Sequence, residues 1–328
     1  MELSVWFLCF FVPPIATVPP APPPNPLLLP HDALKTASQF CTQNPNPLLC
    51  VVGPTASGKT DFSLDLAEKV GGEIINTDSR QFYRGMNIGT AKITPEEMRG
   101  IPHYALDFLD PDQDFSVGEF VPLAEQYIAE IASRGKIPML VGGSGLFVDA
   151  LRKNFEIPAV PPDWDFREKM EQKSNDDLWK MLFERDPETA KKRDKSRRRN
   201  IIRALEVIHS TGKKFSELCT VAPKKYNDLV FSLWIPPDVL AQRIHIRAEK
   251  MIAEGLIDEV RSLAGKGFSE QSPAFVAHGY REMMLFLRGE CSLLSVLEKM
   301  SIATRQYAKR QRTWWRAQGD VIWVQGVV

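Results

Sequence analysis

The sequence has few cysteines, no long apolar run and no excess of either charge. Its five cysteines include no C-x-x-C pair and no Cys/His cluster with the spacing of zinc ligands, so we expect neither a disulfide scaffold nor a zinc site. Because no stretch of about 18 apolar residues is present, we expect no membrane span and a cytoplasmic protein with reduced thiols. The 41 basic and 41 acidic residues cancel in number. A local basic patch can still bind nucleic acid, because nearby charges set the field at a binding face.

The first 47 residues are rich in proline and almost free of basic side chains. Up to residue 58 the one Lys or Arg is Lys35, and prolines interrupt the apolar stretch 5–18. A secretory signal would carry positive charge before that stretch, where this sequence has only Glu2. We therefore predict that residues 1–47 form a disordered or dispensable leader and that order begins at Leu48. A targeting peptide is the alternative for this segment.

Beyond the leader, short apolar runs alternate with helical patterns. Strands are expected at residues 48–52, 73–77, 138–141, 229–235 and 321–324, and helices at 61–70, 122–134, within 238–263, and at 292–317. This alternation predicts an α/β fold, a P-loop NTPase-like parallel sheet flanked by helices. Ligands of such sheets bind beyond the carboxyl ends of the strands.

The segment 153–207 breaks this alternation. It begins with a proline-rich hinge and continues as charged sequence with a helical pattern and no strand signal. A chain of 328 residues also exceeds the usual size of one hydrophobic core. We therefore predict an α/β core formed by residues 48–152 and 208–328, with an all-helical insertion domain at 153–207.

The strongest local signal is a phosphate-binding loop. It fits the pattern G-x-x-x-x-G-K-[ST] between an expected strand and an expected helix, and consists of Gly53, Pro54, Thr55, Ala56, Ser57, Gly58, Lys59 and Thr60. Glycines let successive backbone N–H groups point inward, and the helix N-terminus adds positive potential. We expect Lys59 to reach phosphate oxygens and the Thr60 hydroxyl to coordinate Mg²⁺. The motif predicts a phosphate-bearing ligand without specifying ATP.

A second polar segment begins at Asp78, directly after the second expected strand. We expect that strand to neighbour the phosphate-loop strand, so that the Asp78 carboxylate faces the same crevice. There it could act as a general base or bind magnesium through water. Capping of a turn is the alternative role for Asp78.

Together these segments resemble the isopentenyl-tRNA transferase family, the tRNA dimethylallyltransferases. The resemblance rests on GPTASGKT at 53–60 and DSRQFYRGMNIGTAK at 78–92, in that order. It continues in PHYALD at 102–107, LVGGSGLF at 140–147, RALEV at 203–207 and TRQYAKRQRTW at 304–314. The similarity extends from residue 50 to about residue 323 and leaves out the leader.

The resemblance implies a reaction and a set of roles. The family transfers a dimethylallyl group from dimethylallyl diphosphate to the exocyclic N6 amine of the adenosine 3′-adjacent to the tRNA anticodon, position 37. The phosphate loop would then hold the diphosphate of the donor, and no phosphoryl group would be transferred. By this resemblance Asp78 is the general base, Ser144 (usually Thr in the family) bonds or positions the diphosphate, and Arg243 neutralises it.

The resemblance also implies partners and contacts. The partners are the tRNA anticodon stem-loop and dimethylallyl diphosphate. The residues expected at the tRNA are Asp78, Ser79, Arg80, Gln81, Arg167, Arg199, Asn200, Ile201, Ile202, Arg203, Val276, Ala277, His278, Gly279, Tyr280 and Arg281. His278 stands where the family has a small aliphatic residue, so we expect it to pack or to meet a base edge. No Cys/His pair follows Cys291, so we expect no C-terminal zinc finger.

Two basic segments support a nucleic-acid partner. From residue 191 to 203 eight basic side chains oppose one acid, which favours phosphate-backbone contact over a solvated helix face. In the last expected helix, one stripe of basic residues follows i, i+4, i+7, i+11 spacing: Arg305, Lys309, Arg312 and Arg316. For the adjacent Trp314 and Trp315 we favour core and edge packing over a role as base-stacking platforms.

Two other functions are compatible with a phosphate loop. A small-molecule or nucleoside kinase would need an adenine site and usually a pair of lid arginines, and it explains neither basic segment. A non-catalytic RNA-binding ATPase switch would not need Asp78 for its RNA function. We favour the prenyl transferase and expect a monomer.

Overall fold

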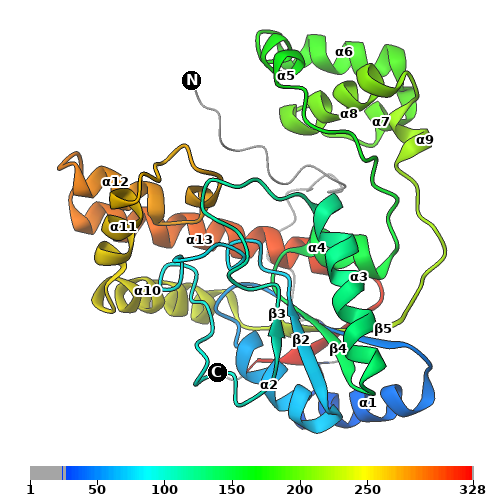
Figure 1. Cartoon of the computed structure of the whole chain (residues 1–328), viewed down its shortest axis with the longest axis vertical. Helices are drawn as coiled ribbons and strands as arrows, with labels where there is room; N and C mark the ends of the chain where they lie inside the picture. Colours follow the sequence, from blue (N-terminus) through cyan, green and yellow to red (C-terminus); the bar gives the residue numbers. More distant parts are fainter. Residues whose placement is uncertain (1–23, 25–26, 327–328) are drawn as a thin grey trace.

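The computed structural model describes residues 24 and 27–326, and its central element is a six-stranded parallel sheet (Figure 1). The strands are β1 (Pro47–Val52), β2 (Gly72–Asn76), β3 (His103–Tyr104), β4 (Ile137–Val141), β5 (Asn227–Trp234) and β6 (Val321–Gln325). Their order in the sheet is β3-β2-β4-β1-β5-β6. The predicted parallel sheet flanked by helices is confirmed, and each of the five predicted strands matches an observed one to within two residues at either end. β3 was not predicted, because a strand of two residues is too short to show an alternating apolar pattern.

The strand order corrects one expectation. β2, which ends just before Asp78, pairs with β3 and β4 and does not neighbour β1. β4 lies between β2 and β1 and pairs with both. The glycine turn that follows β4 at 142–145 therefore stands between the phosphate loop and Asp78. Local periodicity cannot predict this order, because long-range pairing determines it.

Helices cover both faces of the sheet because successive strand residues point to opposite sides. Leu48, Cys50 and Val52 of β1 pack into a cluster that includes residues of α3 (Val117–Ser133) and α4 (Gly145–Arg152). The alternate residues Leu49 and Val51 pack into a second cluster with α1 (Pro30–Gln43) and α2 (Lys59–Val70). With both faces buried, β1 has the continuous apolar sequence of a central parallel strand.

The prediction that order begins at Leu48 is wrong. Residues 30–43 form α1, whose Ala33 and Ala37 are fully buried against α2 and the sheet. Leu28 also makes a parallel bridge to Val324 in β6. The proline content hid an amphipathic helix that starts at a proline, a position where the missing N–H costs nothing. Residues 1–23, 25 and 26 of the predicted leader lie outside the described residues.

A helical lobe lies between α4 and β5 in the chain. It consists of α5 (Trp164–Glu171), α6 (Asn175–Arg185), α7 (Pro187–Lys191), α8 (Arg198–Thr211) and α9 (Phe215–Leu218). These helices pack around their own hydrophobic cluster, which includes Leu178, Leu182 and Leu205, and Figure 1 shows them standing apart from the sheet. The predicted boundary at residue 207 falls inside α8, so the helical segment continues to Leu218.

After β5 the chain forms a further set of helices. They are α10 (Pro237–Ala253), α11 (Leu256–Gly265), the 3₁₀ turn at Pro273–Val276, α12 (Tyr280–Leu287) and α13 (Leu293–Arg316). Gly255, with a φ of 106°, separates α10 from α11. Among the described residues no helix is both long and apolar enough to cross a membrane, and the four cysteines there are free.

Burial of α1 predicts that Ala37→Asp destabilises the protein. The new carboxylate would have no partner in a fully buried position, and we expect a loss of about 3 kcal/mol in the free energy of unfolding. Gln39→Asp, on the exposed side of the same helix, is the control. Denaturant unfolding that gives the two variants equal stability would contradict the packing of α1.

Candidate active site at the carboxyl ends of the strands

Three loops meet where β1, β2 and β4 end: the phosphate loop (53–60), the turn 77–81 and the glycine turn (142–145). A Cβ atom on Gly142 would lie 2.3 Å from the Thr77 hydroxyl oxygen and 2.9 Å from the backbone nitrogen of Asp78. A Cβ atom on Gly143 would lie 3.3 Å from the carbonyl oxygen of Gly53. Only glycine allows the three loops to approach this closely.

The phosphate loop has the backbone that the motif requires. Gly53 and Gly58 have φ angles of 133° and 86°, and Ala56 has one of 62°. α2 begins within this segment, at Lys59, so the N–H groups of its first turn are available to an anion. The Ser57 hydroxyl is buried and has no hydrogen-bond partner within residues 24 and 27–326. A bound anion would satisfy these donors.

Lys59 lies in an environment that favours an incoming negative charge. Its Nζ donates a hydrogen bond to the Pro54 carbonyl at 2.7 Å. Burial lowers the pKa of Lys59 to about 8; Asp78 opposes this shift and Arg247 adds to it. Burial also lowers the pKa of Arg247, and Asp78 partly restores it. These three charged groups therefore share one site, in which two partly desolvated cations outnumber one carboxylate.

A cavity of about 80 Å³ adjoins the phosphate loop. Its lining includes Thr55 of the loop together with Asp78 and Arg80. The Asp78 carboxylate accepts a hydrogen bond from the Arg80 N–H at 3.0 Å. The other lining residues are Gly89, Thr90, Arg247, Ala248, Met251, Ala277, His278, Met300, Thr304 and Tyr307. The structure thus brings Asp78 and the phosphate loop to one cavity, although their strands are not adjacent.

Helix α10 contributes an arginine that the sequence analysis missed. Among the described residues the cavity lining includes Arg247 and does not include Arg243, which lies one turn earlier on α10. The i, i+4 spacing places both arginines on one face of the helix and could have identified Arg247. Neutralisation of a diphosphate by Arg243 stays a prediction.

One face of α13 closes the site. Thr304 and Tyr307 line the cavity, and Gln311 follows one turn later. The buried Gln311 accepts a hydrogen bond from the Thr55 N–H at 2.9 Å. A Cβ atom on Gly143 would lie 1.8 Å from its Nε2. Gln311 therefore joins the phosphate loop to the glycine turn. Gln311 was not predicted as a site residue, although it lies in the block 304–314.

Ser144 and His278 both meet Tyr307. The buried Ser144 hydroxyl adjoins the Tyr307 side chain, whose pKa is raised chiefly by burial and also by Asp78. The rings of His278 and Tyr307 have an edge-to-face arrangement with centroids 5.6 Å apart. Burial and then Arg80 lower the pKa of His278, so this imidazole is neutral near pH 7. These contacts agree with packing or base-edge contact as the role of His278.

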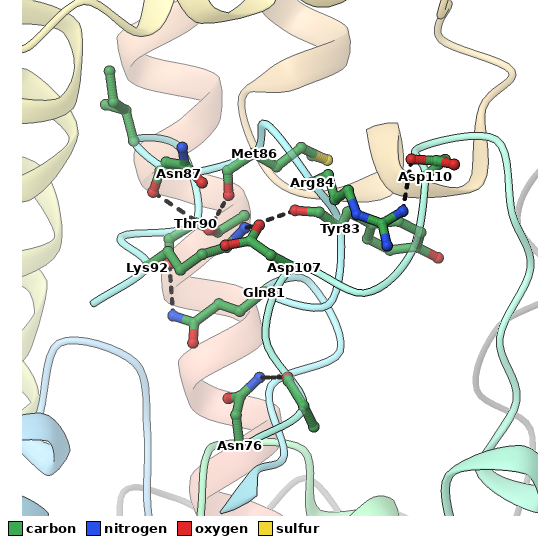
Figure 2. A network of polar contacts seen from close by, with 12 residues as sticks. Asn76, Gln81, Tyr83, Arg84, Met86, Asn87, Thr90, Lys92, Asp107 and Asp110 are labelled. Carbon is green, nitrogen blue, oxygen red and sulfur yellow. Dashed lines mark hydrogen bonds and ion pairs between the residues drawn. The ribbon is translucent and has the colours of Figure 1, made fainter. Parts of the chain in front are cut away.

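The turn 77–81 is held by the segment that follows it (Figure 2). The Gln81 Nε2 donates hydrogen bonds to the carbonyl oxygens of Thr90 at 3.2 Å and Ala91 at 3.1 Å. The buried Lys92 donates to the carbonyl oxygen of Tyr83 at 2.6 Å and to the Asp107 carboxylate. Segment 82–92 therefore supports the Gln81 side chain.

The predicted tRNA contacts in α8 differ in exposure. Arg199 is exposed. Asn200, Ile201 and Ile202 are buried, and both isoleucines belong to the core of the helical lobe. The two isoleucine side chains therefore hold the lobe together, whereas Asn200 also lines a groove beside the lobe.

Two other predicted tRNA contacts, Arg167 and Arg203, both donate hydrogen bonds to the carboxylate of Glu206. Arg167 donates to the two oxygens of Glu206 at 2.6 and 2.9 Å, and Arg203 donates to Glu206 at 2.5 Å. Glu206 is fully buried, and these hydrogen bonds lower its pKa although burial alone would raise it. Arg167 and Arg203 thus fix the start of α5 against α8.

The segment 276–281 lies partly at the cavity and partly in the core. Ala277 and His278 line the cavity. Tyr280 is fully buried, and its hydroxyl donates to Glu259 at 2.6 Å. Its side chain therefore offers no surface to RNA. On α13, Trp315 is fully buried, and Trp314 is partly buried against the core and donates to Asp149 at 2.9 Å, which confirms core and edge packing for these tryptophans.

A parallel sheet that carries an anion cradle and a carboxylate-lined cavity at its carboxyl edge defines an α/β enzyme acting on a phosphate-bearing substrate. A family model described as IPP transferase matches residues 81–318. The chain belongs to the IPP transferase family.

Similar proteins agree with this assignment. The chain is 42% identical over 283 residues to a tRNA dimethylallyltransferase of Bacillus pumilus, covering 84% of this chain and 89% of that one. A tRNA dimethylallyltransferase of Roseiflexus is 41% identical over 280 residues, with 84% and 92% covered. The crystal structure of the tRNA isopentenylpyrophosphate transferase of Bacillus halodurans aligns with a TM-score of 0.65 and 40% identity, covering 86% and 90%. A structure of a eukaryotic dimethylallyltransferase acting on tRNA aligns with a TM-score of 0.75 and 28% identity, covering 86% and 74%.

The contact between Gln311 and Thr55 predicts a role in anion binding. Gln311→Ala should weaken the binding of inorganic pyrophosphate about fivefold to tenfold, because the phosphate loop loses one hydrogen bond that holds its N–H groups in place. Titration calorimetry measures this change. Gln306→Ala, exposed on the same helix, should bind as the wild type does. Unchanged affinity in Gln311→Ala would contradict the role of Gln311.

The pKa of Lys59 predicts a pH dependence. Lys59 is charged below about pH 8 and loses its proton as the pH rises through that value. Pyrophosphate affinity should therefore fall across this range, because the neutral amine no longer attracts the anion. Lys59→Met, measured in parallel, accounts for the titration of pyrophosphate itself. Parallel pH profiles for the two proteins would contradict the prediction.

Proposed function

We propose that the protein transfers a dimethylallyl group from dimethylallyl diphosphate to the exocyclic N6 amine of the adenosine 3′-adjacent to the tRNA anticodon, position 37, and releases diphosphate. The observation that carries this proposal is the cavity shared by the phosphate loop and Asp78. The family membership argues against the kinase alternative.

The positive charges of the site would stabilise the leaving group of the proposed reaction. When the carbon–oxygen bond of the donor breaks, negative charge grows on the departing diphosphate. Lys59 in the loop and Arg247 on α10 are half-buried cations, and oriented donors in a partly desolvated site stabilise such charge more than water does. The groups would therefore bind the transition state more tightly than the ground state.

Asp78 would act as the general base when the nitrogen–carbon bond forms. The attacking amine forms a nitrogen–carbon bond, and its proton becomes acidic as that bond develops. The half-exposed carboxylate of Asp78 would accept this proton. The acceptor base must leave its stack to reach the cavity, which is cheapest in a single-stranded loop.

The residues present fit a hydrated Mg²⁺. Within the described ranges no group of three or more His, Cys, Asp or Glu could hold a metal. Mg²⁺ usually keeps several waters and binds through one or two protein oxygens and the phosphates of a substrate. The Thr60 hydroxyl, exposed in the first turn of α2, would hold it beside the diphosphate, where the ion would neutralise charge.

The helical lobe would hold the RNA backbone. A groove of about 430 Å³ between the lobe and the core is lined by Lys153, Lys192, Arg193 and Arg197 among other residues. Exposed basic side chains attract phosphates regardless of sequence. We therefore assign the lobe to the anticodon stem and the cavity to the acceptor base.

The direct test is incubation with labelled dimethylallyl diphosphate and unmodified tRNA, followed by nucleoside analysis. The expected product is adenosine labelled on its exocyclic amine at position 37. Label found elsewhere, or transfer of phosphate from ATP, would contradict the proposal.

The role of Asp78 predicts that Asp78→Asn lowers the single-turnover rate by about 10²–10⁴. The amide has the shape of the carboxylate but cannot accept the proton. Binding of tRNA and of pyrophosphate should stay close to wild type. Wild-type turnover in Asp78→Asn would remove Asp78 from the reaction.

A further inference from the structure

A carboxylate outside the cavity holds the segment beneath Gln81. Glu259, on α11, reaches the turn 87–89 from a distant part of the chain. Its Oε2 accepts hydrogen bonds from the N–H groups of Asn87 and Ile88, each at 2.8 Å. Its Oε1 accepts one from the Gly89 N–H at 3.2 Å. Successive N–H groups that converge on one anion form an internal anion site, and such charge-assisted bonds are stronger than neutral ones.

Tyr280 completes this contact from the other side. Its hydroxyl donates to the Oε1 of Glu259 at 2.6 Å. A Cβ atom on Gly89 would lie 2.5–2.7 Å from the Tyr280 ring and hydroxyl, so the turn can lie against the ring only because residue 89 is glycine. Burial and Glu259 raise the pKa of Tyr280 well above its usual value. The phenol therefore stays protonated and remains a donor.

The turn 87–89 is connected to Gln81 through the backbone of residues 90 and 91, and Figure 2 shows Asn87, Thr90 and Gln81 along this segment. The N–H groups of Ala91 and Lys92 donate to the carbonyl oxygens of Ile88 and Asn87, each at 2.9 Å. The turn that Glu259 holds thus fixes the carbonyl groups of Thr90 and Ala91. Those two carbonyl groups accept the hydrogen bonds of the Gln81 amide.

This arrangement determines which atom of the Gln81 amide can bind a base, the nitrogen or the oxygen. Both bonds to the 90–91 backbone are made by Nε2, the donor end. Within the part of the chain that the structure describes, no donor bonds to Oε1. An amide oxygen is an acceptor. It can pair with the exocyclic amine of adenine, which donates, but not with a carbonyl oxygen at the same position of a base.

We propose that Glu259 is a positioning residue for the acceptor base: with Tyr280, it holds residues 87–91 so that the Gln81 amide oxygen accepts a hydrogen bond from the exocyclic amine. This proposal rests on the proposed function, because it concerns the acceptor of that reaction. Glu259 touches neither the donor nor the acceptor and acts through Gln81.

Glu259→Gln tests the proposal with little change in shape. Its amide nitrogen would be a donor where the wild type accepts from backbone N–H groups or from Tyr280, so the turn 87–89 should shift. We expect kcat/KM for an anticodon stem-loop RNA to fall about tenfold or more, while the KM for dimethylallyl diphosphate stays unchanged. In a Gln81→Ala background the same substitution should cause little further loss. Multiplicative losses would show that Glu259 does not act through Gln81, and would overturn the proposal.

A measurement of RNA binding distinguishes the positioning role of Glu259 from a general loss of structure in the variant. Stem-loop RNAs with adenosine or inosine at the target position differ in the group at C6, an amine in one and a carbonyl in the other. The wild-type protein should prefer adenosine, and Glu259→Gln should reduce that preference to the level of Gln81→Ala. A preference unchanged in Glu259→Gln would overturn the proposal.

Two further variants complete the design. Glu97→Gln is the matched control, because Glu97 accepts a backbone N–H from Thr94 at 2.9 Å in an exposed turn, and it should behave as wild type. Tyr280→Phe removes a single donor and should reduce the preference for adenosine less than Glu259→Gln does, so it serves if the latter fails to fold. The binding test does not depend on transfer: a wild-type protein that prefers adenosine but forms no prenylated product contradicts the proposed function and leaves the base contact standing.

Discussion

The missing side chains of Gly142 and Gly143 determine how the rest of the site is arranged. β4 lies between the strands that carry the phosphate loop and Asp78. The turn after β4 must therefore have no side chains where the phosphate loop and the turn 77–81 approach it. A Cβ atom at either position would collide with Thr77, Asp78 or Gln311. Because the turn has no side chains there, Asp78 and the loop reach one cavity across an intervening strand. The Asp78 carboxylate then lies close enough to Lys59 and Arg247 to oppose the lowering of their pKa values by burial.

Two helices late in the chain, α11 and α13, contact the loops at the carboxyl edge of the sheet. α13 contributes Gln311 to the phosphate loop and Tyr307 to the cavity. α11 contributes Glu259 to the segment beneath Gln81. In the proposed reaction the donor side and the acceptor side of the cavity would thus be stiffened by separate helices. That separation suits a transfer in which a leaving diphosphate and an attacking amine must be aligned on opposite sides of one carbon.

The parts of this structure that are local in the chain could be predicted from the sequence. The phosphate loop has a fixed spacing between a strand and a helix, and β1, β4 and β5 have apolar runs long enough to identify. The position of β4 between β2 and β1 could not be predicted, because both orders are compatible with the same runs. Gln311 and Glu259 were missed for a related reason. Each acts on backbone groups about 170 residues or more away, and nothing in a local pattern marks a side chain for such a contact. Helix α1 was missed because the proline-rich stretch before it resembled a linker.

In the proposed reaction one cavity holds the departing diphosphate and the attacking amine, with Asp78 beside the amine. The most direct measurement is a crystal structure with a non-reactive analogue of dimethylallyl diphosphate and an anticodon stem-loop RNA. The account predicts the diphosphate on the N–H groups of residues 53–60 and the adenine amine within hydrogen-bond distance of the Asp78 carboxylate. An adenine bound in the groove at the helical lobe, or an analogue bound away from the phosphate loop, would contradict it.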